Sequence, residues 1–234
     1  MRVTVVLPTY NEAENVPLML PALLEQPVSV VVVDDNSPDG TGDIAEAWAR
    51  REPRVAVVRR AGKLGLGTAY VAGFNHALAH GAEAVITIDA DFSHNPRYIT
   101  PMIAAAEHAD LVIGSRYVKG GRVGYPFHRR FLSRTANFVA RTALGLTPLD
   151  CTAGFRLYRA ETLRKTPIDR IRSNGYSFLV EMLTYAQRTG IRVAEVPIDF
   201  VDRARGVSKI SSAEIGKGMG TVGRLFLRRL TGRL

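Results

Sequence analysis

A run of valines, Val28–Val33, is the feature that most restricts the fold of this chain. Five of its six residues are valine, and it ends abruptly at Asp34 and Asp35. β-Branched residues favour strands, and a strand without polar alternation is predicted to be buried on both faces. Such a strand needs a covering layer on each side, which is typical of a parallel sheet flanked by helices.

The pattern of short apolar runs and amphipathic stretches continues to about Gly114 and predicts a Rossmann-like α/β domain with a mostly parallel central sheet. A length of 234 residues suits one domain, which we place at 1–212, followed by a helix at 213–234. Strands are predicted at Val3–Leu7, Val28–Val33, Val55–Val58, Ala84–Ile88, Leu111–Ile113 and Val193–Val196, and helices at Glu14–Glu25, Thr41–Arg51, Thr68–His80, Pro96–Glu107, Arg129–Leu144 and Phe178–Arg188.

Charge is distributed unevenly along the chain. Residues 1–115 hold 8 basic and 14 acidic side chains, whereas residues 116–172 hold 13 and 3, and residues 173–234 hold 10 and 5. A basic second half suggests contact with phosphate groups, although an arginine-rich solvated surface accounts for part of it. The chain begins with a strand pattern, lacks a long apolar segment and has one cysteine, Cys151. We therefore expect a cytoplasmic protein without a membrane span.

Two acidic clusters follow predicted strands. Asp89-Ala90-Asp91 comes directly after one strand, and carboxylates in such a place suit Mg²⁺ or Mn²⁺ bridged to substrate phosphates. Asp34-Asp35 follows the valine strand, where one aspartate is expected to accept hydrogen bonds from a nucleobase or ribose. The first strand leads to Pro8-Thr9-Tyr10-Asn11-Glu12, which has no glycine to approach a pyrophosphate, so NAD binding is disfavoured.

Several motifs, in order from residue 3 to about residue 212, together resemble the family 2 glycosyltransferases, and more narrowly the dolichyl-phosphate and polyprenyl-phosphate mannosyltransferases. The resemblance implies a GT-A fold and inverting, metal-dependent transfer of mannose from GDP-mannose to a polyprenyl phosphate. The motifs are Pro8-Thr9-Tyr10-Asn11-Glu12, Val33-Asp34-Asp35-Asn36-Ser37-Pro38-Asp39-Gly40-Thr41, Leu64-Gly65-Leu66-Gly67-Thr68-Ala69-Tyr70, Asp89-Ala90-Asp91-Phe92-Ser93-His94, Gly114-Ser115-Arg116-Tyr117, Gly154-Phe155-Arg156-Leu157-Tyr158-Arg159, Val201-Asp202-Arg203 and Gly206-Val207-Ser208-Lys209.

The resemblance also implies roles for individual residues. Asp89, Ala90 and Asp91 would hold the ribose, the metal and the diphosphate, with Ser93 standing where many family members have a glutamine near the metal. Asp89, Asp91, Arg116 and Arg203 are accordingly the expected catalytic residues. The guanine nucleoside would contact Pro8, Tyr10, Glu12, Val33 and Asp35. Three basic residues would contact phosphate groups or close over the donor, namely Arg116, Arg203 and Lys209.

The acceptor phosphate is expected to bind the basic helix predicted at Arg129–Leu144. A phosphate monoester is largely dianionic at neutral pH and needs no strong general base. Arg130 and Arg134, four residues apart beside Ser133, share one helical face and could clamp such a phosphate. His94 and His128 are interpreted as polar loop residues.

The C-terminal segment is predicted to be a basic amphipathic helix on the cytoplasmic face of the membrane. At about 100° per residue, Ile215, Met219, Val222, Phe226 and Leu230 share one face, and Lys217, Arg224 and Arg228 the other. Packing on the protein core explains the same periodicity. A membrane-protein partner is also compatible with this segment.

Two rival functions remain open at this stage. A related family 2 enzyme would transfer glucose or another sugar from a UDP-sugar to the same lipid. A nucleic-acid-binding protein would suit a pI near 10.0, but it would leave the paired aspartates unexplained.

Overall fold

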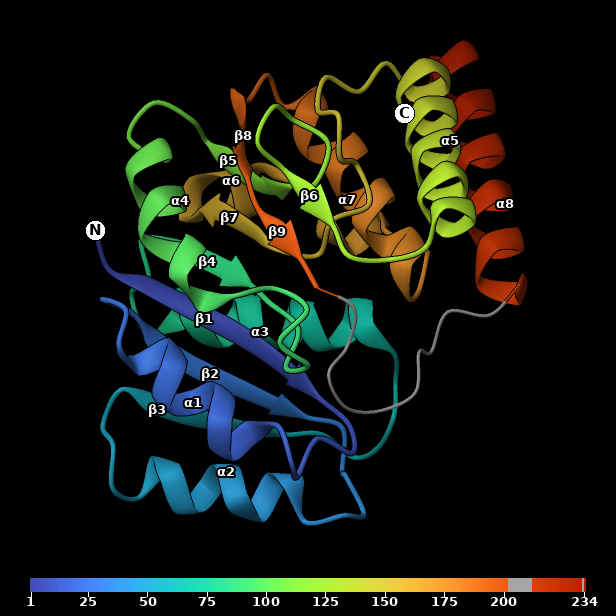
Figure 1. The fold of residues 1–234 in the computed structure, drawn as a ribbon. Helices are drawn as coiled ribbons and strands as arrows, with labels where there is room; N and C mark the ends of the chain where they lie inside the picture. Colours follow the sequence, from blue (N-terminus) through green and yellow to red (C-terminus); the bar gives the residue numbers. More distant parts are fainter. Residues whose placement is uncertain (202–211, 233) are drawn as a thin grey trace.

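The computed structural model describes residues 1–201, 212–232 and 234. A seven-stranded sheet with the order β3-β2-β1-β4-β7-β5-β8 forms its centre (Figure 1). β7 runs antiparallel to both of its neighbours, and the other pairings in this sheet are parallel. The strands are β1 (Val3–Thr9), β2 (Ser29–Asp34), β3 (Val55–Arg59), β4 (Ala84–Thr87), β5 (Leu111–Ser115), β7 (Arg156–Arg159) and β8 (Val193–Pro197), with β6 (Arg122–Val123) and β9 (Asp199–Phe200) forming a small second sheet.

Helices cover both faces of the central sheet, as the valine run predicted. Val30 and Val32 pack in the core with α1, α2 and α4, whereas Val31 and Val33 pack in the core with α3 and α7. β2 is therefore buried on both sides, because successive side chains of a strand point to opposite faces. The α-helices are α1 (Val16–Leu24), α2 (Thr41–Ala49), α3 (Leu66–Ala79), α4 (Ile99–Ala105), α5 (Phe127–Leu144), α6 (Ala160–Lys165), α7 (Tyr176–Arg188) and α8 (Ser212–Leu230), and two 3₁₀ turns span Pro96–Tyr98 and Ile168–Arg170.

β7 is the one strand of the central sheet that the sequence did not predict; the short strands β6 and β9 of the second sheet were not predicted either. β7 opens with Arg156, which lies completely buried in the middle of the sheet. Its guanidinium donates to the carbonyl oxygens of Ala153 (2.8 Å), Leu179 (2.7 Å) and Cys151 (2.6 Å). These bonds satisfy a buried cation that has no carboxylate partner within the described part of the chain, and they hold the loop that precedes the strand.

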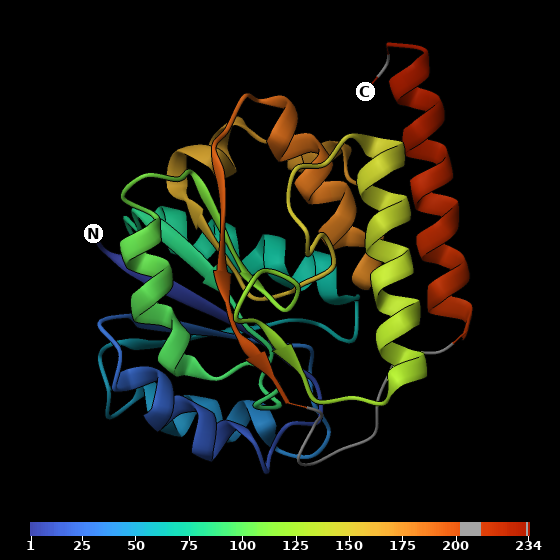
Figure 2. The same cartoon turned by 45° about the horizontal axis from the view of Figure 1, so that its top comes forward.

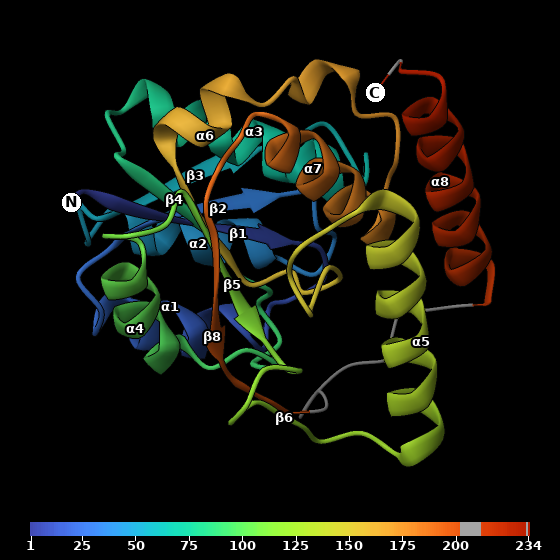
Figure 3. The ribbon, with the colours of Figure 1, turned by 90° about the horizontal axis from the view of Figure 1, so that it is seen from above.

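Two long helices, α5 and α8, pack against each other at one side of the domain (Figures 2 and 3). α8 also packs on α7, so the C-terminal helix is docked on the domain rather than separate from it. Among the described residues, no helix is both long enough and apolar enough to cross a membrane.

The predicted helix at 213–234 exists, but its two faces lie differently from the prediction. Val222 and Leu225 are buried against the domain. Arg224 donates to Glu181 (2.8 Å) and Arg228 to the Tyr185 hydroxyl (3.1 Å), so these two arginines contact α7. The outward side instead carries Met219, Phe226, Leu227 and Leu230, while the side chain of Ile215 lies outside the described residues. Arg224 and Arg228 share one helical face, as predicted, but this face packs on the domain, where a buried glutamate and a tyrosine of α7 bind the two arginines.

Candidate active site

One edge of the central sheet collects most of the residues that the sequence pointed to. β1, β2 and β4 run parallel, and β7 is antiparallel to both β4 and β5, so β1, β2, β4 and β5 all end at this edge. Ligands of open α/β sheets bind at such an edge. The structure brings to it Pro8, Tyr10, Glu12, Val33, Asp35, Asp89, Ala90, Asp91 and Arg116, whereas Arg203 and Lys209 lie outside the described residues.

The two aspartates after β2 have different environments. The buried Asp34 carboxylate accepts hydrogen bonds from the Thr9 hydroxyl (3.0 Å), from the Ser37 amide (3.0 Å) and hydroxyl (2.6 Å), and from Arg59 (3.3 Å). These bonds join the carboxyl ends of β1, β2 and β3. Asp34 is thus engaged within the protein, which leaves Asp35 as the candidate for nucleoside recognition.

Asp35 forms a nearly buried ion pair with Arg60, at 2.6 Å between Oδ1 and Nη1. Burial raises the pKa of the Asp35 carboxyl above its ordinary value, although Arg60 opposes this shift. Nearby, Lys63 Nζ lies 4.3 Å from the centre of the Tyr10 ring, within cation–π range. The loop after β3 therefore contacts two of the five predicted nucleoside residues, Tyr10 and Asp35.

Asp89, Asp91 and Ser93 lie in the loop after β4. Ser93 donates to Asp91 Oδ1 through its amide (3.0 Å) and its hydroxyl (2.6 Å), and the Tyr70 hydroxyl lies 3.4 Å from Asp89 Oδ1. The described residues contain no group of three His, Cys, Asp or Glu side chains that could hold a metal unaided. Two carboxylates and a hydroxyl nevertheless fit Mg²⁺ or Mn²⁺, which bind through one or two carboxylates completed by substrate phosphates and water.

Arg116, directly after β5, is held by a bidentate ion pair that sequence reasoning missed. Its Nε and Nη2 donate to the two oxygens of Asp150, both at 2.7 Å. Burial alone would raise the pKa of the Asp150 carboxyl, but the adjoining Arg116 guanidinium outweighs it and holds the pKa below its usual value. The pair spans 34 residues of sequence. The only sequence signal was an acidic residue just before the Gly154-Phe155-Arg156 motif.

His94 lies in the loop after β4, as predicted, but its surroundings are aromatic rather than polar, and His128, also predicted in a loop, lies on α5. The His94 ring is buried, with ring centres 5.4 Å from Phe155 and 5.1 Å from Phe200. Burial lowers the pKa of His94 to about 4, so the imidazole is neutral at pH 7. Its Nδ1 has no hydrogen-bond partner among the described residues.

Cys151, the single cysteine of the chain, is also buried. Burial raises the pKa of its thiol to about 12, which argues against a thiolate nucleophile at neutral pH.

The three predicted acceptor residues lie on α5. Ser133 Oγ accepts a hydrogen bond of 2.6 Å from the Tyr117 hydroxyl, which ties the helix to the loop after β5. Arg134 Cζ lies 5.7 Å from the centre of the Tyr117 ring, and the Arg130 side chain is exposed. Ser133 and Arg134 therefore adjoin the Arg116 loop, and Arg130 lies one helical turn before Arg134.

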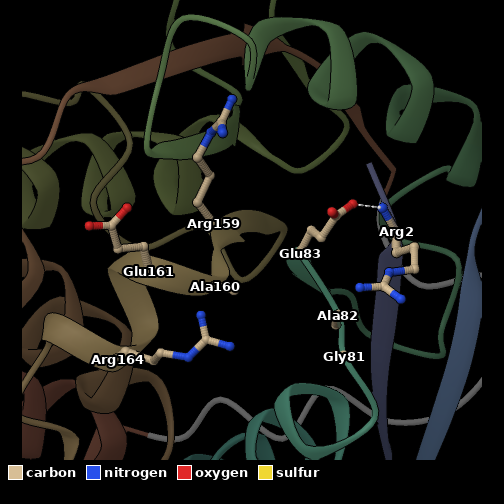
Figure 4. Close-up of a pocket in the computed structure, with 8 residues that line it drawn as sticks. All are labelled: Arg2, Gly81, Ala82, Glu83, Arg159, Ala160, Glu161 and Arg164. Carbon is tan, nitrogen blue, oxygen red and sulfur yellow. Dashed lines mark hydrogen bonds between the residues drawn. The ribbon is translucent and has the colours of Figure 1, made fainter.

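A separate surface hollow occurs at the opposite edge of the sheet (Figure 4). Arg2 and Glu83 immediately precede β1 and β4, and Ala160 follows the antiparallel β7, so this hollow adjoins the amino ends of the parallel strands. It shares no residue with the site at the carboxyl edge.

Comparison with known proteins agrees with this geometry. The model of glycosyl transferase family 2 matches residues 4–166. The undecaprenyl-phosphate mannosyltransferase of Micrococcus luteus is 47% identical over 96% of this chain and 93% of its own length. The polyprenol monophosphomannose synthase of Mycolicibacterium smegmatis is 44% identical over 97% of this chain and 88% of its own length.

Solved structures share the fold at lower identity. Glucosyl-3-phosphoglycerate synthase from Mycobacterium tuberculosis, in complex with Mn²⁺ and UDP, superposes with a TM-score of 0.67 at 22% identity, covering 97% of this chain and 79% of that one. A mannosyltransferase from Pyrobaculum calidifontis, in complex with GDP-mannose and Mn²⁺, has a TM-score of 0.63 at 19% identity, covering 98% and 64%. The match over most of the chain, together with the carboxylates and the arginine at the carboxyl edge of the sheet, shows that the chain belongs to glycosyl transferase family 2.

Proposed function

We propose that this chain transfers mannose from GDP-mannose to the phosphate of a polyprenol, with inversion at the sugar. The observation that carries the proposal is the pair of relatives at 47% and 44% identity, whose names specify a mannosyltransferase for undecaprenyl phosphate and a polyprenol monophosphomannose synthase. Their similarity covers nearly the whole chain, including the site residues after β1, β2, β4 and β5.

On the donor side, Tyr10 and Asp35 would bind the guanine nucleoside together with Pro8, Glu12 and Val33. Asp89 and Asp91 would hold Mg²⁺ or Mn²⁺, and the bound ion supplies positive charge that stabilises the departing diphosphate. Ser93 keeps the Asp91 carboxylate oriented through two hydrogen bonds to one of its oxygens. The carboxylates therefore select a diphosphate donor that arrives with a divalent cation.

On the acceptor side, the lipid phosphate acts as the nucleophile, because it is already an anion at neutral pH. Such a reaction needs no strong general base, and neither Asp150 nor His94 is suited to be one. Both oxygens of Asp150 are bound to Arg116, and the pKa of His94, at about 4, makes it a weak base. Arg116, Arg130, Ser133 and Arg134 would hold the phosphate on this side, and Arg203 and Lys209, which lie outside the described residues, would contact phosphate groups.

We further propose that α5 and α8 rest on the cytoplasmic surface of the membrane, where the acceptor is embedded. Phe127, Phe131 and Phe138 fall within about 40° of one another on α5, and each side chain is more than 60% exposed. On the neighbouring α8, Met219, Leu227 and Leu230 are each more than half exposed. Exposed apolar side chains next to arginines are typical of helices that bind anionic bilayers. A membrane protein that covers the same residues is the alternative occupant.

The arginine-rich second half would also suit a nucleic acid, but several of its arginines are bound inside the protein. Arg116, Arg156 and Arg224 donate to Asp150, to backbone carbonyls and to Glu181, respectively. This use of charge favours a glycosyltransferase, the family to which the chain belongs, over a nucleic-acid surface.

Purified protein should be incubated with radiolabelled GDP-mannose, UDP-glucose or UDP-N-acetylglucosamine, together with polyprenyl phosphate and Mg²⁺ or Mn²⁺. Of the three donors, we expect only GDP-mannose to give label in the organic phase. This label should be lost when the metal or the lipid phosphate is omitted. Label transferred from UDP-glucose at a higher rate than from GDP-mannose would overturn the donor assignment and favour the polyprenyl-phosphate glucosyltransferase alternative.

A further inference from the structure

The Arg116 guanidinium is almost completely occupied by the protein itself. An arginine carries five N–H donors. Nε and one N–H of Nη2 bind Asp150, the second N–H of Nη2 binds the Thr152 hydroxyl at 2.8 Å, and Nη1 reaches the Tyr125 hydroxyl at 3.3 Å. These four bonds fix the plane of the guanidinium and leave one N–H, on Nη1, outside them.

The chain offers an internal comparison for this pair at the other end of the same strand, β5. Asp110 accepts from the Arg192 amide at 2.8 Å and from its Nε and Nη2, both at 3.3 Å. Asp150 likewise accepts from the Arg116 amide at 3.0 Å as well as from its side chain. The Arg192 side chain is 68% exposed and that of Arg116 only 10%, and Asp150 is completely buried. The same chemistry is thus solvated at one edge and buried at the other.

Stability alone gives little reason for a buried ion pair. Desolvating both charges offsets most of their attraction, so apolar residues of similar size serve a core at least as well. A buried carboxylate beside Arg116 does have two definite effects. It orients the guanidinium, and it makes the pair neutral overall, so that Arg116 offers a directed hydrogen bond rather than a net positive charge.

The pair is also connected to α5. Asn137, a buried residue of that helix, donates to the Thr152 hydroxyl at 3.1 Å and to the Ser133 carbonyl at 2.9 Å, and it accepts from the Cys151 amide at 2.7 Å. Thr152 in turn binds both Arg116 and Asp150. The helix that carries the proposed acceptor residues is therefore hydrogen-bonded to the loop that orients Arg116.

We propose that Asp150 is a positioning residue for mannosyl transfer, which holds Arg116 so that its remaining Nη1 hydrogen meets a phosphate oxygen at the reacting centre. Thr152 and Asn137 set the distance between this hydrogen and the phosphate site on α5. The proposal rests on the proposed function, because it needs a phosphate at that place. Because the Arg116–Asp150 pair carries no net charge, its contribution depends on the direction of the Nη1 hydrogen bond and not on attraction of a substrate. Loss of that direction is therefore expected to lower kcat and to change the KM of either substrate little.

The test uses the full chain and the organic-phase transfer assay. Asp150→Asn, Arg116→Gln, the double variant and the matched control Asp110→Asn are compared for kcat, for both KM values and for melting temperature. Calorimetric titration with GDP and Mn²⁺ counts the binding-competent molecules, which separates a slower site from a partly unfolded sample. Absence of transfer by the unaltered protein would refute the proposed function itself, a result distinct from any difference among variants.

We expect Asp150→Asn to lower kcat by about 100-fold at an unchanged GDP stoichiometry, and to add less than about threefold in the Arg116→Gln background, because the two residues act as one unit. Asp110→Asn should stay within about twofold of the unaltered protein. Losses that multiply in the double variant, or full activity of Asp150→Asn, would overturn the proposal. If Asp150→Asn does not fold, Thr152→Val takes its place, because it keeps the ion pair and removes one hydrogen bond to the guanidinium. A loss of kcat on Thr152→Val that disappears in the Arg116→Gln background supports the proposal. A loss of the same size in both backgrounds contradicts it.

Discussion

Replacing the exposed phenylalanines of α5 by serine should detach the protein from membranes. Phe127, Phe131 and Phe138 are 81%, 65% and 66% exposed. A phenylalanine presents roughly 200 Å² of surface, so about two thirds of it, or ~130 Å², is available to a bilayer at the two less exposed positions. At ~25 cal/mol per Å², complete withdrawal of that area from water is worth about 3 kcal/mol, and insertion to half depth about 1.5 kcal/mol.

One Phe131→Ser replacement should therefore weaken partitioning about tenfold, and the triple serine variant about 1,000-fold. Co-sedimentation with vesicles containing anionic lipid measures the partition coefficient directly. Leu18→Ser is the matched control, because Leu18 is 50% exposed on α1, away from α5 and α8. The reasoning is refuted if the folded triple variant binds vesicles as tightly as the unaltered protein, or if Leu18→Ser weakens binding equally.

Four further outcomes follow from the structure. Asp91→Asn should lower transfer by at least about 100-fold without unfolding the protein, because the diphosphate charge is no longer compensated; activity that persists in chelator would contradict the metal site. Arg134→Gln should raise the KM for polyprenyl phosphate about fivefold and leave that for GDP-mannose unchanged, and initial-rate kinetics with each substrate varied will show whether the arginine serves the acceptor. Glu181→Gln removes the buried carboxylate that binds Arg224 and should lower the free energy of unfolding in urea by about 2 kcal/mol, a smaller loss than for a completely buried pair because Arg224 is 31% exposed. An unchanged urea midpoint would mean that this ion pair does not stabilise the docking of α8. Burial lowers the pKa of His94 from 6.5 to about 4, so the unfolded chain binds more protons than the folded one between these pH values. The free energy of unfolding should therefore be unaffected by this histidine above pH 6.5 and should fall by about 3 kcal/mol towards pH 4. His94→Phe should flatten the stability profile in that range.

The sequence predicted the parts of the fold that depend on local patterning. The valine run placed β2 inside the sheet, and its residues divide between the two cores as a strand buried on both faces must. β7 could not be read in the same way. A strand that begins with the buried cation Arg156 has no apolar signature, and its stability comes from carbonyl groups contributed by residues 151, 153 and 179.

The position of the candidate site residues was predictable where they directly follow a strand, as Asp89 and Asp91 follow β4. Patterning did not separate the structural role of Asp34 from the candidate role of Asp35, since the difference arises from Thr9 and Arg59 in other strands. The Arg116–Asp150 pair and the orientation of α8 were missed for a related reason. Both are decided by a charged partner distant in sequence, Asp150 in one case and Glu181 in the other.

The most direct test of the account is to identify the lipid product. Purified protein should be supplied with GDP-mannose, Mg²⁺ and a polyprenyl phosphate, and the extracted lipid examined by mass spectrometry and by NMR of its anomeric proton. The account predicts a polyprenyl phosphate that has gained one mannose in β linkage, formed together with one equivalent of GDP, because direct displacement inverts the α configuration of the donor. An α-linked product, a sugar attached elsewhere than the phosphate, or GDP release without a mannosylated lipid would contradict it.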